Sequence, residues 1–233
     1  MDKEINTNGF DYVDLGLPSG TLWATMNVGA SKPSDYGLYF QWGDTHGYTA
    51  EQVGKDKYFE WSVYKWYYKW AGCQNFTKYT IEGAKLELED DAAHVHMGGD
   101  WHMPTPGQIK ELIDNTTSEW TTLDGVDGRL FTSRKDESKF IFIPAAGNAY
   151  GGSLYTRKRI GSIWSSILGV YHFYYGQRLY FDSVGAYSIS SAPRYGGLSV
   201  RGVIDNNNLK KNILCRLIQK LIRFTSVFKI LEK

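Results

Sequence analysis

Three histidines, His94, His96 and His102, stand close together in the segment HVHMGGDWH. Imidazole nitrogens are common ligands of Zn²⁺, and three of them leave one position of a tetrahedral site open, as in catalytic zinc centres. The other two histidines, His46 and His172, add no recognisable ligand spacing. A metal site is therefore the first chemical hypothesis that the sequence raises.

Four carboxylates follow one another closely in the segment ELEDDAA, at Glu87, Glu89, Asp90 and Asp91. Carboxylate oxygens are preferred ligands of Ca²⁺, but the segment lacks the alternating oxygen ligands and the turn glycine of an EF-hand loop. We therefore expect a solvated turn here.

Nucleophilic catalysis has few candidates in this chain. Cys73 and Cys215 are its two cysteines, so neither a disulfide framework nor a CxxC metal site can be argued. The sequence contains no phosphate-binding loop and no Ser-His-Asp order with a nucleophile elbow. Asp124 and Asp127 each precede a glycine, which is typical of turns. We expect no enzyme activity.

The segment WSSILGVYHFYYGQRLYFDS, residues 164–183, combines tyrosines with glycine and serine and carries little charge. Tyrosine gives a large, fairly rigid contact area with a hydroxyl group, and serine and glycine let the backbone adapt, as in antibody loops. An inward-facing set must hold such loops, and we assign Trp164, Leu179, Phe181, Leu198 and Val200 to it. The predicted ligand contacts are Ile167, Tyr171, His172, Phe173, Tyr174, Tyr175, Arg178, Tyr180, Tyr187, Ile189, Arg194 and Tyr195.

Short elements with clear turn signals must position these residues. Residues 11–30 read as two strands joined by a turn at Pro18–Gly20, and residues 35–44 as a further strand. The apolar residues of segment 47–86 fit neither the helical nor the strand spacing, so we expect a long loop packed by its own aromatic rings. From residue 163 to 203, short strands and turns alternate.

The segment MPTPGQIKELIDN predicts an amphipathic helix that ends near Asn115. Thr105 and Gln108 form a capping box, and Pro106 suits the first helical position. The segment EWTTLDGVDGRLFTS then predicts a hairpin with Asp-Gly turns, and KFIFIPAAG a buried strand that stops at Pro144.

Composition bounds the class of protein. The 233 residues include 25 glycines and 15% aromatic residues, which favours a loop-rich β or α+β domain. Net charge is +1, so the whole chain shows no signature of nucleic-acid binding. The polar N-terminus contains no apolar stretch of the kind a Sec signal has, and no apolar run reaches the length of a membrane span.

Three parts are expected: an N-terminal extension at residues 1–9, a ligand-binding domain at 10–204 and a tail at 205–233. The tail has seven basic and two acidic residues, against 19 and 23 in residues 1–204. Its apolar residues recur at helical spacing, which predicts a basic amphipathic helix. Such a helix can pack on the body or form a homo-oligomer, lie on an anionic membrane, or form only on binding.

Several segments together resemble a family of gut Bacteroidetes and their prophages. They are DYVDLGLPSGTLWATMNVGA, DYGLYFQWGD, LELEDDAAHVHMGGDWHMPT, IFIPAAG, WSS and SVRGV, in consistent order from about residue 10 to 204. The resemblance is to domains of the formylglycine-generating-enzyme type, among them the variable proteins of diversity-generating retroelements. It implies an α+β, C-type-lectin-like fold, to which the predicted tail helix is added.

The resemblance also implies that residues 165–203, here termed the variable window, are diversified by mutagenesis at adenines. Randomised adenine-adenine-pyrimidine codons do not encode Trp, Lys, Glu, Met or Gln. The variable window contains no Trp, Lys, Glu or Met and one Gln, Gln177. This bias is the one that such a history predicts.

The resemblance further argues against metal binding and catalysis. Relatives carry Asn-Trp in place of His96-Met97 and Arg in place of His102, so the histidine cluster looks incidental. The calcium-dependent sugar motifs of C-type lectins are missing, and no cysteine lies between Cys73 and Cys215 to act as in the namesake enzyme. We expect no cofactor and no metal.

The expected function is recognition of a protein or glycan on a target cell or phage host, at a cell surface or virion. Alternatives are a structural or adhesive module that uses the aromatic segment for assembly and, less favoured, a formylglycine-generating-type enzyme. A neighbouring reverse transcriptase gene with a template repeat would decide for diversification.

Overall fold

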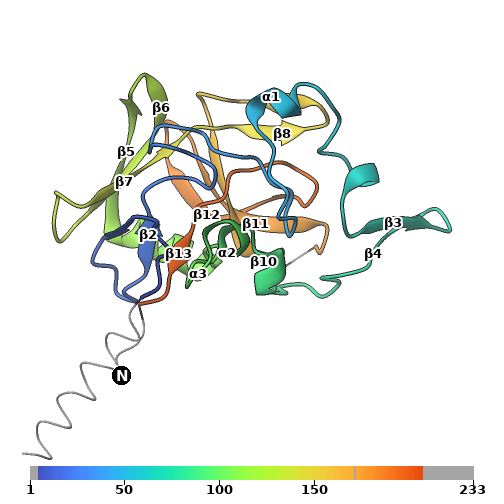
Figure 1. Cartoon of the computed structure of the whole chain (residues 1–233), viewed down its shortest axis with the longest axis horizontal. Coiled ribbons are helices and arrows are strands. Elements are labelled where there is room, and N and C mark those ends of the chain that lie inside the picture. Colours follow the sequence, from blue (N-terminus) through green and yellow to red (C-terminus); the bar gives the residue numbers. More distant parts are fainter. Residues whose placement is uncertain (1–4, 171, 207–233) are drawn as a thin grey trace, which may run out of the picture.

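The computed structural model describes residues 5–170 and 172–206. Small antiparallel sheets form a body, and one two-stranded arm projects from its side (Figure 1). The strands are β1 (Tyr12–Asp14), β2 (Leu22–Ala24), β3 (Tyr67–Trp70), β4 (Cys73–Phe76), β5 (Thr116–Leu123), β6 (Val126–Ser133), β7 (Phe140–Pro144), β8 (Asn148–Tyr150), β9 (Ser153–Tyr155), β10 (Gly161–Leu168), β11 (Tyr175–Phe181), β12 (Ala186–Pro193) and β13 (Val203–Ile204). The helices are α1 (Ala50–Val53), α2 (Ala92–Met97) and α3 (Pro106–Asn115), with 3-10 turns at Trp61–Val63 and Leu88–Asp90.

The fold is mainly β, so the prediction of an α+β, C-type-lectin-like fold is wrong. The three described α-helices have four, six and ten residues, whereas strands recur along the whole body. Frequent glycines and the period-two alternation of apolar residues favour short strands over long helices. The predicted tail helix lies outside the described residues. No helix in the described part of the chain is long and apolar enough to cross a membrane.

The sheet β10-β11-β12 lies at the centre of the body (Figure 1) and, with its connections, spans residues 161–193, which include most of the variable window. Each of the five residues predicted to face inward is fully buried, which confirms that prediction; they are Trp164, Leu179, Phe181, Leu198 and Val200. Gly176 at the start of β11 is required by close packing, because a Cβ there would lie 2.5 Å from Cδ1 of Trp42.

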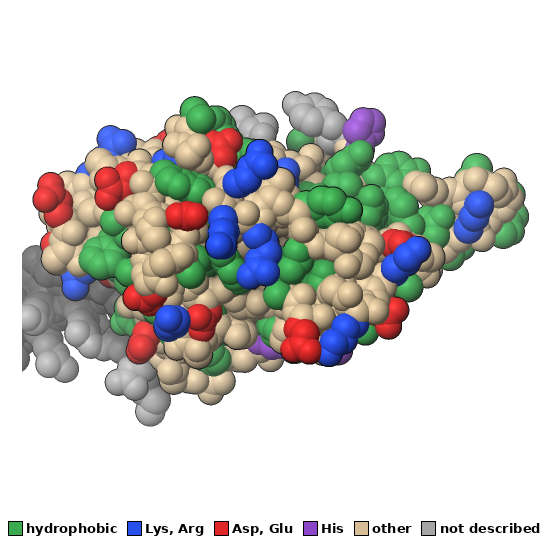
Figure 2. Space-filling model, turned by 90° about the horizontal axis from the view of Figure 1, so that it is seen from above, with side chains coloured by type: hydrophobic (Ala, Val, Ile, Leu, Met, Phe, Trp, Pro, Cys, Tyr) green, Lys and Arg blue, Asp and Glu red, His purple; other side chains and the backbone are tan. Residues whose placement is uncertain are grey.

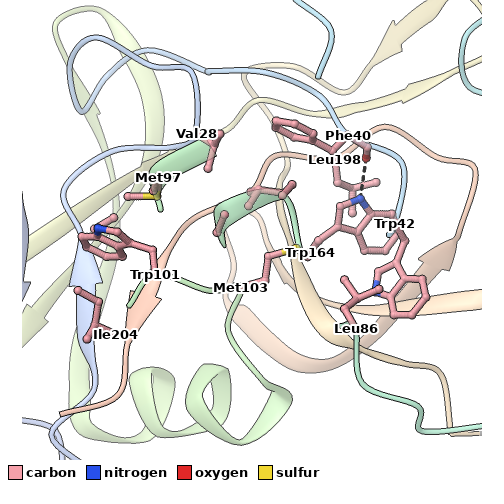
Figure 3. Close-up of a cluster of buried hydrophobic side chains, with 14 of the residues drawn as sticks. Val28, Phe40, Trp42, Leu86, Met97, Trp101, Met103, Trp164, Leu198 and Ile204 are labelled. Atoms are coloured by element: carbon pink, nitrogen blue, oxygen red, sulfur yellow. Dashed lines mark hydrogen bonds between the residues drawn. The ribbon is translucent and has the colours of Figure 1, made fainter. Parts of the chain in front are cut away.

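Two tryptophans join the central sheet to the N-terminal half of the body (Figure 3). Nε1 of Trp164 donates to the carbonyl oxygen of Phe40 at 2.7 Å, and Nε1 of Trp42 donates to that of Ser165 at 2.8 Å. Both indoles are fully buried. These bonds satisfy the polar edge of each ring, so the rings contribute their large apolar area without an unpaired donor.

Helix α3 covers the other face of the sheet and agrees with its prediction in both bounds and cap. Thr105 Oγ1 accepts from the N–H of Gln108, and the Gln108 side chain accepts from the N–H of Thr105. Ile109 and Leu112 are fully buried in the same cluster as Leu179. The predicted hairpin at β5–β6 is confirmed with Asp124 and Gly125 at its turn, but Asp127 and Gly128, also predicted to form a turn, are paired residues of β6.

A buried arginine near the end of the body ties three segments together. Arg201 donates to Oδ1 of Asn27 at 2.9 Å, to the carbonyl oxygen of Ala24 at 2.8 Å and to that of Phe142 at 3.0 Å. Its side chain is fully buried, and burial lowers its pKa because a low-dielectric interior disfavours charge. Strand β2 also pairs with both β1 and β13, so the two ends of the body meet there.

The projecting arm was not predicted, because residues 47–86 were expected to form a loop. Strands β3 and β4 pair from Tyr67↔Phe76 to Trp70↔Cys73. Ala71 and Gly72 form the turn with φ of 48° and 79°. Two positive φ values are the requirement of the tight hairpin turn that matches strand twist, and Ala meets it at a conformational cost. We refer to residues 67–76 as the arm.

Candidate ligand-binding site

A pocket of about 430 Å³ opens between the arm and the end of the central sheet. Its lining, here termed the aromatic pocket, consists of Trp61, Gln74, His172, Tyr174, Tyr175, Pro193 and Tyr195. Hydrophobic side chains gather where the arm joins the body (Figure 2). Its volume is in the range of small-ligand sites, and it combines ring surfaces with a few polar groups, as such sites do.

Trp61 is the centre of the ring contacts that shape this pocket. Its ring centroid lies 4.7 Å from that of Tyr195 and 6.2 Å from that of Tyr174, and both pairs meet edge to face. It also contacts Phe76 at 5.3 Å, at the base of the arm. Edge-to-face pairs stabilise a fixed ring arrangement beyond their buried area. The 3-10 turn at 61–63 and the arm therefore hold one wall of the pocket against the variable window.

Arg194 lies beneath the pocket and connects its parts. Nε donates to the hydroxyl of Tyr64 at 2.8 Å, Nη1 to the carbonyl oxygens of Tyr79 and Phe173 at 3.1 and 3.2 Å, and Nη2 to that of Lys78 at 3.1 Å. Its side chain is fully buried. The prediction that Arg194 contacts ligand is therefore wrong: long-range carbonyls capture the guanidinium, which holds the 172–175 segment in place.

The predicted contact residues fall into two groups rather than on one face. His172, Tyr174, Tyr175 and Tyr195 meet at the aromatic pocket. Tyr180 and Tyr187 pair with each other at 5.9 Å near the far end of β11. Five residues of extended strand separate Tyr175 from Tyr180, or roughly 17 Å.

Three other predicted contacts have structural partners. Arg178 donates to the side chains of Ser190 at 3.2 Å and Ser162 at 3.1 Å, so it ties β11 to its two neighbours. Phe173 is half-buried and stacks on Tyr174 at 4.6 Å. Ile167 is half-buried and pairs with Lys85 in an isolated antiparallel bridge.

Two predicted contacts cannot be placed. Tyr171 lies outside the described residues, and so does the side chain of Ile189.

Sequence reasoning missed Trp61, Gln74 and Pro193, of which the first two lie outside the variable window. The signal that could have found Trp61 is the segment FEWSVYKWYYKWAG, in which tyrosines and tryptophans are denser than in the window itself. This density indicates self-packing, but the segment also supplies Trp61 to the pocket.

None of the described residues that line the aromatic pocket is Asp, Glu, Lys or Arg. Burial, next to Tyr175 and Glu60, raises the pKa of Tyr195, so its hydroxyl stays protonated at neutral pH. Neutral groups that both donate and accept hydrogen bonds therefore line the site.

The acidic segment differs from its prediction as a solvated turn. Asp90 and Asp91 are buried, and Asp91 caps α2 by accepting from the N–H of His94 at 3.0 Å. Glu87, Glu89 and Asp90 are the one described group of side chains close enough to share a metal ion. The Lys78 ammonium already lies among them, 2.5 Å from Glu87 and 2.6 Å from Asp90. These hydrogen bonds raise the pKa of Lys78, so a cation of the chain itself balances the carboxylates.

The three clustered histidines point to three different backbone carbonyls. The ring of His94 bonds Trp101, that of His96 bonds Thr45 and that of His102 bonds Met103, at 2.8 to 3.0 Å. The fold thus engages each ring separately.

A second cavity, of about 290 Å³, is lined by residues such as Phe10, Met26 and Met97, none of which belongs to the variable window. Its lining comes from the N-terminal strands and α2. Scans against family models, curated proteins and solved structures found no match to this chain.

Proposed function

We propose that this chain is a non-enzymatic ligand-binding protein whose variable window is diversified by a retroelement. The observation that carries the proposal is the division of labour within the window. His172, Tyr174, Tyr175 and Tyr195 line a pocket, whereas Leu179, Phe181 and Leu198 are fully buried. Side chains at the pocket can change without altering the packed frame, which is the requirement for a surface that varies. The ligand is a protein or glycan on a target cell or phage host.

Diversification is tested by sequencing the same locus across isolates. We expect substitutions to be confined to residues 165–203 and, within them, to concentrate at the pocket residues. Arg194 stays constant, because its four hydrogen bonds reach groups that no other side chain in its place would satisfy. Substitutions spread evenly over the body, or absent from the window, would contradict the proposal.

Binding is tested with Tyr174→Ala and Tyr175→Ala. Aromatic residues are enriched among interface hot spots, and each truncation should cost about 2 kcal/mol, or roughly a thirtyfold weaker Kd. The measurement is flow cytometry of fluorescently labelled protein on intact Bacteroidetes isolates. Tyr187→Ala is the matched control, because Tyr187 is as exposed as Tyr175, at 45% against 39%, and lies outside the pocket. Unchanged staining by both pocket variants, with both folded, contradicts the proposal.

A further inference from the structure

A second hollow adjoins the aromatic pocket and shares lining residues with it. This neighbouring hollow, of about 270 Å³, is lined by Gly169, Val170, His172, Tyr175, Gln177, Ser190 and Ser191. His172 and Tyr175 line both spaces. Two adjoining compartments of modest size suit a ligand built from consecutive similar units.

The polar groups of the aromatic pocket are unused by the fold. Among the described residues, no hydrogen bond engages the Gln74 amide, the His172 ring, or the hydroxyls of Tyr174, Tyr175 and Tyr195. None of these atoms is buried without a partner, so water reaches them in the free protein. An amide, an imidazole and a phenol can each donate and accept, which matches a ligand rich in hydroxyl groups.

The same pocket offers ring surface next to those polar groups. Trp61, Tyr174 and Tyr195 surround it, and Pro193 adds an apolar edge. Rings of this kind contribute dispersion and apolar burial against a ligand with C–H faces. No Asp, Glu, Lys or Arg lines either space among the described residues, so neither compensates a charged ligand.

We propose that the aromatic pocket and the neighbouring hollow bind successive rings of a neutral oligosaccharide. This inference rests on the proposed ligand-binding function and names its ligand class. A pyranose ring presents apolar C–H faces and several hydroxyls at once. A proline-rich peptide also fits aromatic grooves but offers about one carbonyl acceptor per residue. Five unused groups that both donate and accept around one pocket favour the sugar.

The first experiment is a glycan array that carries neutral and charged hexasaccharides, with an immobilised decaproline peptide for comparison. We expect binding to neutral members alone, with a Kd that changes less than about twofold between about 0.05 and 0.5 M salt, because no charge pair forms. Gln74→Ala and Tyr174→Phe each remove one hydrogen-bonding group and should weaken binding about fivefold to tenfold. Tyr187→Phe is the matched control and should bind as wild type.

The second experiment treats the cells, before they are stained, with periodate, which cleaves vicinal diols of glycans, or with protease. Loss of staining after periodate and its persistence after protease support the inference. Staining that depends on Tyr175 but survives periodate contradicts the assignment of a sugar ligand, while the ligand-binding function remains supported. Array binding confined to charged glycans or decaproline, or absent from every neutral member, also overturns it. Sugar binding that is unaffected by both pocket substitutions overturns the site itself.

Discussion

Arg194→Met should lower the free energy of unfolding by about 4 kcal/mol, a large share of the ~5–15 kcal/mol typical of a domain. The substitution keeps much of the volume but leaves the carbonyl oxygens of Lys78, Tyr79 and Phe173 without their donor. An unpaired acceptor costs about 1–3 kcal/mol where it is buried, as at Tyr79, and less where it is partly buried, as at Phe173 and Lys78. These acceptors are backbone carbonyl groups, so no second substitution can remove them and compensate for the lost donor.

Urea denaturation followed by tryptophan fluorescence measures the effect, with Arg159→Met as the control. Arg159 is exposed, and a surface change of this type should stay within about 0.5 kcal/mol. Binding should fall with stability, because Arg194 fixes the Phe173 carbonyl next to the pocket tyrosines. If the free energy of unfolding of Arg194→Met lay within about 1 kcal/mol of the wild-type value, the carbonyl oxygens would have found other donors.

Arg201→Met should be similarly costly, by about 3–5 kcal/mol, but without a direct effect on the pocket. Ala24 and Phe142 would each lose the donor to a backbone oxygen, and Asn27 would lose its side-chain partner. Leaving three buried acceptors without their donor, at about 1–3 kcal/mol each, is among the few mechanisms that give losses of this size.

Arg201→Lys separates charge from geometry at the same position. Lysine keeps the positive charge but cannot present the planar fork that reaches three acceptors at once. We therefore expect most of the loss to remain, measured by the same denaturation. Full rescue by lysine would show that charge alone matters there. Arg201→Met with wild-type stability would contradict the assigned role of the three bonds.

Elements with a complete local signal were predicted from the sequence. The Thr105–Gln108 capping box placed α3, the Asp124-Gly125 pair placed the β5–β6 turn, and Pro144 ended β7. Each signal acts within a few residues, so neighbours in the sequence suffice to determine the outcome.

The arm lacked such a signal, because its turn uses Ala71 at positive φ instead of Asn or Asp. The α+β class rested on the family resemblance, whereas the alternation and turn signals of the sequence predicted short strands, and such strands form most of the body.

The candidate site was predicted in part. The Tyr-rich composition identified the window, but four of its predicted contacts meet at the pocket, and Arg194 lies beneath it. Arg194 is buried because it bonds Tyr64 and Tyr79, which lie more than 100 positions away in the sequence. Trp61 and Gln74 reach the pocket over similar separations. No local pattern encodes such contacts.

The arm has a consequence for the range of targets. It supplies Gln74 to the pocket, and Trp61 stands at its base, yet neither belongs to the variable window. Under the diversification proposed for that window, every descendant of this gene would therefore keep these two residues of the pocket lining. Such a lineage would shift its preference among chemically related targets, because the constant ring and amide would continue to contact each new ligand.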